Sequence, residues 1–276
     1  MKRLDGRTAV VTGAASGIGR ALAEALAEAG AHLAICDVNE KALEETAERV
    51  RARGRRVSTH VADVSNRARM EALPAEVLAS HGGVHVLVNN AGVTSIAKFE
   101  SQPLANFDWV MGVNFWGVVH GCKFFLPELQ KADEAHIVNI SSVFGILGVP
   151  MQSAYCSSKF AVRGFSESLR AELSDTNVGV TSVHPAGVAT NIVRDARFGN
   201  ETTSEMKSGL LDQFTKHLPP EKAAERILEA IRKNRPRVLV AKGSGAIDAL
   251  QRLSPVLGSK ITVRVWKRMQ RERKNG

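Results

Sequence analysis

The chain has 276 residues, of which 44% are hydrophobic and 24% charged, and it carries a formal net charge of +9. This length fits one large α/β domain or two small ones, and the composition excludes a disordered chain. No apolar run approaches the roughly 18 residues of a membrane span, the first residues lack the pattern of a secretory signal, and the three cysteines form no C-x-x-C motif. We therefore expect a cytoplasmic protein with reduced thiols.

Over the first 190 residues or so, short β-branched runs alternate with stretches of helical periodicity. The runs expected to form strands are Thr8–Val11, His32–Cys36, Arg56–Val61, Val84–Val88, His136–Ile140 and Gly179–His184. The stretches expected to form helices are Gly17–Ala29, Glu40–Arg53, Arg67–Ser80, Phe107–Leu129 and Ser153–Leu173, and Pro220–Lys233 and Arg237–Val240 add one more helix and strand. This alternation predicts βαβ units and a parallel sheet with helices on both faces.

The segment of about residues 186–219 interrupts the alternation because it has no clear periodicity. An irregular connection of that length in a compact domain is usually a functional lid or substrate loop. Its larger apolar residues are Val188, Ile192, Val193, Phe198, Met206, Leu210, Leu211 and Phe214. We expect some of them to belong to the core and the others to line a ligand site.

The first predicted strand runs through TGAASGIG, residues 12–19, directly into the first predicted helix. Glycines in such a unit let the chain turn tightly, approach a phosphate and pack the helix against the strand, while the helix N-terminus offers free N–H groups to a pyrophosphate. The spacing is G-x-x-x-G-x-G, and a purely structural turn is the alternative interpretation. We predict a dinucleotide site formed by Gly13, Ser16, Gly17, Ile18 and Gly19.

Asp37 ends the second predicted strand. A carboxylate at this place can accept hydrogen bonds from both ribose hydroxyls of adenosine and would repel a 2′-phosphate. No Lys or Arg follows Asp37 before Lys41, so the pattern favours NAD(H) over NADP(H), with an ordinary turn aspartate as the alternative. Asp63, after the third strand, could accept from the adenine amino group, and Val64 beside it is a further candidate contact.

Several motifs occur in one order along the chain. They are TGAASGIG at 12–19, NNAG at 89–92, Asn114, NISS at 139–142, and Tyr155 with Lys159 in YCSSK. With them, the sequence resembles the short-chain dehydrogenase/reductase family over about residues 5–242. The resemblance implies a single-domain, Rossmann-like, doubly wound α/β fold with a mainly parallel seven-stranded sheet, a catalytic NAD-binding domain over residues 1–242, and a homodimer or homotetramer.

The resemblance also implies roles for single residues. NNAG would steady the central sheet beside the cofactor, and Asn114 would hold a water that passes protons from Lys159 to solvent. The further residues expected at the cofactor are Asn90, Ala91, Gly92, Tyr155, Lys159, Val188 and Thr190. The chain departs from the family where Ala186 separates Pro185 from Gly187, because the family usually has Pro-Gly there.

Tyr155 is the only tyrosine of the chain, and Lys159 follows it by one helical turn. A free phenol has a pKa of about 10, and a nearby ammonium group together with the charge of NAD⁺ favours the phenolate. The phenolate can take a hydroxyl proton while a hydride leaves the same carbon for the nicotinamide. Ser142, thirteen residues before Tyr155 as in the family, would hold the substrate oxygen, and we prefer it to Ser141.

Other chemistries are not expected from these residues. The histidines show no H-x-x-x-H motif and no clustering with cysteine, so the sequence predicts no metal site. His184 fits a strand-end residue better than a catalytic base. Ser142 lacks the G-x-S-x-G context of a common class of serine hydrolases.

Apolar residues dominate the sequence around the catalytic set. We predict a substrate pocket of Ser142, Phe144, Leu147, Val149 and Ile192, and a hydrophobic secondary alcohol or ketone as the substrate. One alternative is a 3-oxoacyl-[acyl-carrier-protein] reductase, whose usual preference for NADPH disagrees with Asp37. A non-catalytic NAD-binding regulator is a second alternative, against which the intact Tyr155 and Lys159 argue.

Residues 243–276 exceed what the family fold usually needs, and we expect a helical, basic extension. Seven Lys or Arg lie between residues 260 and 276 against the single Glu272, so this segment holds +6 of the net charge. With its interspersed apolar residues, the segment fits weak contact with an anionic membrane surface. It fits better a segment that packs on a neighbouring subunit with its charges solvated. It contains no recognised nucleic-acid-binding module, so we expect no nucleic-acid partner.

Overall fold

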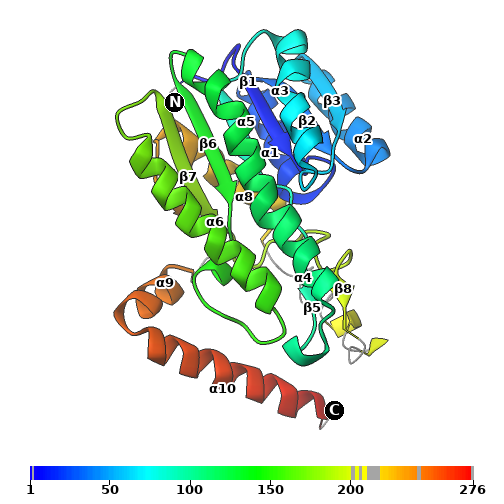
Figure 1. Ribbon diagram of the computed structural model, residues 1–276, viewed down its shortest axis with the longest axis vertical. Coiled ribbons are helices and arrows are strands. Elements are labelled where there is room, and N and C mark those ends of the chain that lie inside the picture. The colour runs from blue at the N-terminus through cyan, green and yellow to red at the C-terminus, as the bar shows by residue number, and fades with distance from the viewer. Residues whose placement is uncertain (2, 200–202, 205–206, 210–217, 241–243, 275–276) are drawn as a thin grey trace.

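A computed structural model describes residues 1, 3–199, 203–204, 207–209, 218–240 and 244–274 (Figure 1). Within these residues a seven-stranded sheet forms in which every neighbouring pair is parallel. Its strands follow the order β3 (Val57–Val61), β2 (His32–Asp37), β1 (Thr8–Thr12), β4 (Val86–Asn89), β6 (Ala135–Ile140), β7 (Val178–His184) and β9 (Arg237–Leu239). The predicted Rossmann-like fold with a parallel seven-stranded sheet is confirmed.

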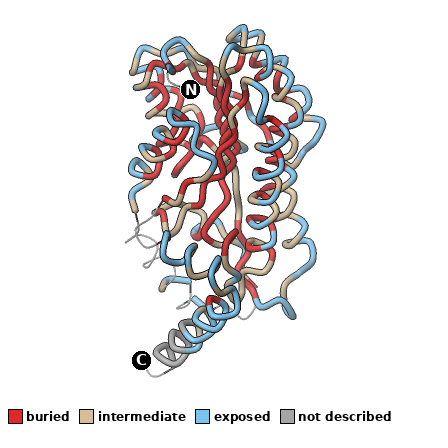
Figure 2. The backbone as a smooth tube through the Cα atoms, turned by 90° about the vertical axis from the view of Figure 1, so that its left-hand side faces the viewer, coloured by how far each residue is buried: buried red, intermediate tan, exposed pale blue. Residues whose placement is uncertain are grey.

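The sheet is covered by helices on both faces, and the hydrophobic core is divided accordingly. One cluster packs under α1 (Gly17–Glu28), α2 (Glu40–Arg51) and α8 (Pro220–Arg232), and the other under α3 (Arg67–His81), α5 (Gly117–Lys131) and α6 (Ser153–Glu172). Val11 belongs to the first cluster and its neighbour Val10 to the second, because successive strand residues point to opposite faces. Figure 2 shows these buried strands through the middle of the molecule. A central parallel strand therefore needs an unbroken apolar run.

The helix predicted over Phe107–Leu129 is not continuous. The structure divides this stretch into α4 (Leu104–Met111), a π-helical turn η2 (Gly112–Trp116) and α5. A π-turn adds one residue to a helical turn and is often found at functional sites. Here the turn contains the fully buried Asn114, a polar residue whose amide needs partners outside the helix.

Several short elements near the carboxyl ends of the strands were not expected from the sequence. Two-residue strands β5 (Ser95–Ile96) and β8 (Arg197–Phe198) pair in parallel, and η1 (Phe99–Ser101) and η3 (Val143–Gly145) are single 3₁₀ turns. Elements of this length are too short to show a hydrophobic period. The β5–β8 pair attaches the loop of residues 186–219 to the segment that follows β4.

The C-terminal extension forms two helices, α9 (Ser244–Leu253) and α10 (Pro255–Lys274). Figure 1 shows them lying across the end of the molecule toward which the strands point. Among the described helices, none is both long enough and apolar enough to cross a membrane. We call α9 and α10 together the C-terminal arm.

Candidate active site

A cavity of about 1250 Å³ opens at the carboxyl ends of the central strands. Strand order reverses at this place, because β2 and β3 lie on one side of β1 while β4, β6 and β7 lie on the other. Ligands of doubly wound sheets bind in the crevice at such a reversal. The cavity exceeds the roughly 300–1,000 Å³ of an ordinary small-molecule site, so it has room for a dinucleotide and a second molecule.

The glycine turn and the N-terminus of α1 form one end of the cavity. Ser16, Gly17 and Ile18 all line it, and in this described segment the N-cap residue Ser16 makes no side-chain capping bond. The N–H groups of the first helical turn are therefore available to a ligand. Gly13 has a φ of +65°, and a Cβ there would lie 2.7 Å from the Cα of Ala91. Gly13 therefore permits both the left-handed turn and the close approach of the NNAG segment.

Gly19 packs α1 against the glycine turn. It does not line the cavity, and a Cβ at Gly19 would lie 2.1 Å from the carbonyl oxygen of Gly13. The absence of a side chain lets α1 pack directly on the turn. Gly19 thus supports the site through packing, which is one of the roles that we predicted for these glycines.

NNAG holds the glycine turn from the side of β4. Asn90 donates from Nδ2 to the carbonyl oxygens of Thr12 and Gly13, each at 3.0 Å. The Thr12 hydroxyl oxygen accepts from the backbone N–H groups of Asn90 and Ala91 at 3.0 and 3.1 Å. These bonds join the ends of β1 and β4 and leave Asn90, Ala91 and Gly92 on the cavity wall. We did not single out Thr12, because a threonine within a strand has no distinguishing sequence signal.

Asp37 lines the cavity together with Asp63 and Val64. Its carboxylate accepts from the backbone N–H groups of Ala15 and Asn39, both at 3.0 Å. Each carboxylate oxygen has a second lone pair, so both can still accept from a ribose hydroxyl.

Arg20 also lines the cavity, although we did not consider it from the sequence. Its guanidinium is engaged by the protein: Nε donates to the Thr46 hydroxyl at 3.0 Å and Nη2 forms an ion pair with Glu45 at 3.2 Å. The carboxylate of Asp37 therefore keeps acceptor capacity for a ligand, whereas Arg20 is engaged within the protein. The glycine cradle, the exposed helix N-terminus and Asp37 together fit a dinucleotide of the NAD type.

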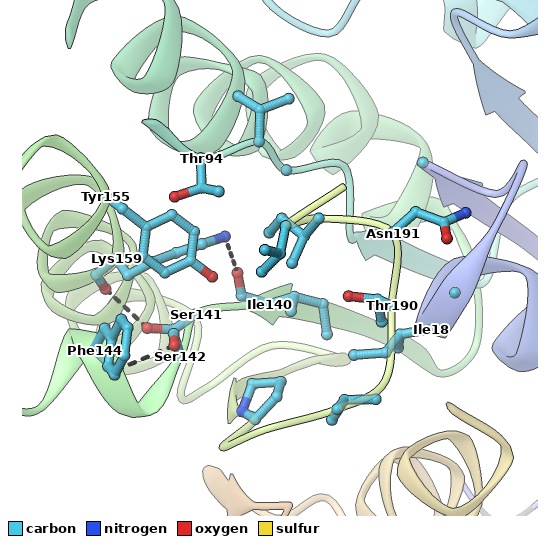
Figure 3. A pocket seen from close by; sticks show the side chains of 18 of the residues that line it. Ile18, Thr94, Ile140, Ser141, Ser142, Phe144, Tyr155, Lys159, Thr190 and Asn191 are labelled. Carbon is cyan, nitrogen blue, oxygen red and sulfur yellow. Dashed lines mark hydrogen bonds between the residues drawn. The ribbon is translucent and has the colours of Figure 1, made fainter. Parts of the chain in front are cut away.

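Tyr155 and Lys159 lie on one face of α6 and meet Ser142 at the middle of the cavity (Figure 3). The Lys159 ammonium donates to the carbonyl oxygen of Ile140 at 2.9 Å, and its Nζ is 5.6 Å from the centre of the Tyr155 ring. The Ser142 hydroxyl accepts from the N–H of Phe144 at 3.1 Å, and Ser142 and Tyr155 line the same part of the cavity. A phenol, a hydroxyl and an ammonium group thus converge from α6 and from the end of β6.

Without a bound cofactor, burial determines the protonation states of Tyr155 and Lys159. It lowers the pKa of Lys159 to about 8 and raises the pKa of Tyr155 to about 12. Both shifts follow because a buried charge loses its hydration. We predicted acidification of Tyr155 by Lys159 together with the charge of NAD⁺, and the shifts described here concern the protein without that charge.

Asn114 lies behind the cavity wall. Its Oδ1 accepts from the N–H of Val93 at 2.8 Å, and its Nδ2 donates to the Val93 carbonyl at 2.9 Å and to the Ser158 hydroxyl at 3.0 Å. Both donors are used, which leaves one lone pair of Oδ1 for a water. The amide therefore ties the segment after NNAG to α6, close to Lys159.

His184 and Ser141 hold the backbone around Ser142 and Lys159. The His184 ring bonds through Nδ1 to the Ser142 carbonyl at 2.9 Å and through Nε2 to the Ser182 hydroxyl at 3.1 Å, and burial lowers its pKa to about 4. His184 is therefore neutral near pH 7 and bonds the backbone of Ser142. Ser141 donates to the carbonyl oxygen of Lys159 at 2.8 Å, which connects β6 to α6 just below the Tyr155 ring.

Apolar side chains form the wall beyond Tyr155. Phe144, Leu147, Val149 and Ile192, which we predicted for a substrate pocket, all line the cavity. The Phe144 ring stands edge-on to Tyr155, with ring centres 6.1 Å apart. The predicted loop residues Met206, Leu210, Leu211 and Phe214 lie outside the described residues.

Val188 and Thr190 stand between this apolar wall and the glycine turn. Both line the cavity, and Thr190 Cγ2 lies 3.1 Å from the Cβ position of Gly17. The additional residue between Pro185 and Gly187 therefore does not remove these two residues from the site. Across the described part of the chain, no group of three or more His, Cys, Asp or Glu is arranged to hold a metal ion.

The C-terminal arm supplies part of the cavity wall, which we did not foresee. The arm residues that line the cavity are Ile247, Leu250, Gln251, Gly258, Ile261, Thr262 and Trp266. Their three- and four-residue spacing was visible in the sequence as an amphipathic pattern. That pattern does not reveal which surface an apolar helix face covers, and we assigned it to a neighbouring subunit or a membrane.

Comparisons with known proteins agree with this geometry. A profile of the family described as short chain dehydrogenase matches residues 7–200. A Mycobacterium tuberculosis protein named as the oxidoreductase SadH is 40% identical over 92% of this chain and 92% of its own. Estradiol 17-beta-dehydrogenase 11 of Homo sapiens is 32% identical over 95% of this chain and 86% of its own. A crystal structure of a short-chain dehydrogenase/reductase from Burkholderia phymatum in complex with NAD is 35% identical, with a TM-score of 0.87 over 93% of this chain and 96% of that one.

Proposed function

Because the chain belongs to the short-chain dehydrogenase/reductase family and is an oxidoreductase acting on CH–OH groups, we propose that it interconverts a hydrophobic secondary alcohol and its ketone with NAD(H). The observation that carries the proposal is the convergence of Ser142, Tyr155 and Lys159 in one cavity. They stand between a helix N-terminus suited to a pyrophosphate and an apolar wall suited to the substrate.

The chain's own residues perform the proton chemistry in this proposal. When bound, NAD supplies the nicotinamide carbon that accepts or returns the hydride. In alcohol oxidation the C–H and O–H bonds break and a C=O bond forms. Ser142 orients the substrate oxygen, Tyr155 takes the hydroxyl proton, and Lys159 stabilises the phenolate charge at the moment of transfer. In ketone reduction the Tyr155 phenol returns that proton to the oxygen.

The preference for NAD(H) over NADP(H) rests on Asp37. Its carboxylate lines the adenosine end of the cavity, where it would attract ribose hydroxyls and repel a phosphate. The only Arg that lines this end, within the described residues, is bound to Thr46 and Glu45. Two related crystal structures, at 35% and 26% identity, contain NAD, which supports the same cofactor here.

The lipophilic nature of the substrate rests on the wall beyond Tyr155. Apolar side chains from η3, from the loop after β7 and from the C-terminal arm line the cavity that contains Ser142 and Tyr155. A site built to bind a polyol would need polar partners for each hydroxyl, because unpaired buried polar groups are costly. The name of the relative estradiol 17-beta-dehydrogenase 11 indicates a lipophilic secondary alcohol and supports this substrate class.

Two alternatives remain distinguishable by observation. A 3-oxoacyl-[acyl-carrier-protein] reductase would prefer NADPH, which Asp37 disfavours. A non-catalytic NAD-binding regulator would have no need of Ser142, Tyr155 and Lys159 in the contacts described above. We favour the dehydrogenase for both reasons.

The test follows NADH and NADPH absorbance during turnover of a panel of lipophilic secondary alcohols, polyols and 3-oxoacyl thioesters. We expect the highest kcat/KM for lipophilic alcohols with NAD⁺. The variant Tyr155→Phe should lose at least about a hundredfold in kcat, as expected for a group that transfers the proton, while NADH still binds. Polyols as the best substrates would overturn the substrate class, and unchanged turnover by Tyr155→Phe would overturn the mechanism.

We also propose a cytoplasmic homodimer or homotetramer. The described cysteines Cys36, Cys122 and Cys156 are all buried free thiols, which agrees with a reducing compartment. The basic residues of α10 allow weak contact with anionic membranes. The apolar residues of the arm that line the cavity would take no part in that contact.

A further inference from the structure

The C-terminal arm presents an uncharged face to the cavity. Ile247 and Leu250 of α9 line it, as do Ile261 and Trp266 of α10. Ile247 and Leu250 are three residues apart, and Trp266 follows Gly258 and Thr262, which also line the cavity, at steps of four. These spacings place each set on one side of its helix. Of the described arm residues that line the cavity, none is charged, although α10 is strongly basic. The inner face of the arm is therefore suited to an apolar ligand.

Other apolar residues of the arm point away from the cavity. Leu253 and Val256 are 86% and 67% exposed and do not line it. Ile247 and Ile261 are only 37% and 38% exposed, and the space they face is the cavity. The arm therefore has an outer apolar surface, and a substitution there can serve as a control for a substitution on the inner face.

The arm is fixed to the catalytic domain beside the cavity. Arg237 of β9 donates to both carboxylate oxygens of Asp248 in α9 at 2.7 and 3.2 Å, and both side chains are only 15% exposed. A bidentate, partly buried pair of this kind fixes orientation as well as distance. At the junction of the two helices, a Cβ at Gly258 would lie 2.2 Å from Oε1 of Gln251. The inner face is thus presented in a defined position.

The arm brings two polar side chains to the cavity, Gln251 and Thr262. Ser142 and Tyr155 mark the reacting end, and the Thr262 hydroxyl on the arm already donates to the carbonyl oxygen of Gly258 at 3.1 Å. A substrate oriented by its reacting oxygen would extend its remaining atoms along Phe144 and Leu147 toward the arm. The distal part of such a substrate gains binding free energy with each methylene that it buries.

We propose that the C-terminal arm is the distal wall of the substrate chamber and selects secondary alcohols and methyl ketones with a long apolar body. Leu250 and Ile261 are the specificity-determining residues of this wall. The proposal rests on the proposed function, because it assumes that the reacting oxygen lies at Tyr155.

The test compares Leu250→Trp with Leu253→Trp, which adds the same side chain to the outer face of the same helix. The ligands are two methyl ketones, one of about four and one of about ten carbons, and their alcohols. We expect Leu250→Trp to lower kcat/KM for the long substrate by about tenfold or more and to leave the short one within about twofold. Leu253→Trp should change neither, and NADH should bind all three proteins equally.

A second measurement separates this proposal from the proposed function. Calorimetric titration of both ketones into the NADH-loaded protein reports binding whether or not turnover occurs. We expect the wild type to prefer the long ketone and Leu250→Trp to lose that preference, with Ile261→Trp as a second variant should Leu250→Trp not fold. If the protein showed no turnover but the wild type still bound the long ketone more tightly than the short one, only the proposed function would be overturned, and the arm proposal would stand. An unchanged preference in the inner-face variants, an equal loss in Leu253→Trp, or no ketone binding would overturn the arm proposal.

Discussion

Tyr155 is held as a neutral phenol by its surroundings. Burial raises its pKa to about 12, and Lys159, with a pKa of about 8, is only partly protonated above neutral pH. A neutral phenol is ready to give a proton to a ketone oxygen, whereas alcohol oxidation first requires the phenolate. The direction of the reaction should therefore respond to pH, with reduction favoured at low pH and oxidation at high pH.

The single tyrosine allows this protonation to be measured directly, since the tyrosinate absorbance of the folded protein reports Tyr155 alone. The folded pKa lies above the unfolded value of about 10, so the folded state holds the proton more tightly. We expect no ionisation below pH 10 without cofactor, and a free energy of unfolding that falls as pH rises above about 10. Saturating NAD⁺ should move the midpoint down, and less so in Lys159→Met.

Circular dichroism of the same samples shows whether the fold persists through the titration. Tyr155→Phe serves as the blank, because it contains no phenol. Ionisation of the cofactor-free folded protein at or below the ordinary value of about 10 would contradict our account of burial.

At the scale of elements, the glycine turn depends on the packing of α1 against the ends of β1 and β4. A Cβ at Gly19 would lie 2.1 Å from the Gly13 carbonyl oxygen and 2.5 Å from Asn90 Nδ2. Gly19→Ala must therefore move backbone and should destabilise the protein by about 1–3 kcal/mol. We also expect NADH affinity to fall by about tenfold or more, measured by fluorescence titration, because the displaced turn forms the dinucleotide site.

Gly164 in α6 provides the matched control. A Cβ there meets nothing within 4 Å, so Gly164→Ala should stabilise the helix by up to about 1 kcal/mol. Its NADH affinity should equal that of the wild type. If Gly19→Ala binds NADH as well as Gly164→Ala does, the turn is not held by the packing described here.

Local patterns predicted most elements and the centre of the site. The spacing of Tyr155 and Lys159 requires only a continuous helix, and α6 runs unbroken from Ser153 to Glu172. The π-turn at Asn114 could not be predicted in this way, because its amide bonds to Val93 and Ser158 far along the chain. The position of the arm depends on contacts between distant segments in the same way.

At the scale of the whole molecule, α5 and the segment before it carry a row of aromatic residues, of which Trp116 is exposed and the others are half-buried. The rings of Phe115, Trp116, His120 and Phe124 follow one another at centre distances of 5.5, 6.2 and 6.2 Å. Trp116 is 52% exposed, and Phe160 of the neighbouring helix α6 is 41% exposed. Clustered exposed aromatic residues are typical of a surface that another protein covers. We therefore expect this face to form the contact between copies of the chain in the homo-oligomer proposed above.

The resulting prediction concerns molecular mass. We expect the wild type to elute as a dimer or tetramer in size-exclusion chromatography with light scattering. The variant Trp116→Glu should have half that mass, because a buried unpaired carboxylate destabilises an apolar interface. Val61→Glu is the control, since Val61 is 48% exposed on β3 at the edge of the sheet and its substitution should leave the mass unchanged. A monomeric wild type would refute the assembly, whereas an unchanged mass of folded Trp116→Glu would assign the interface to another surface.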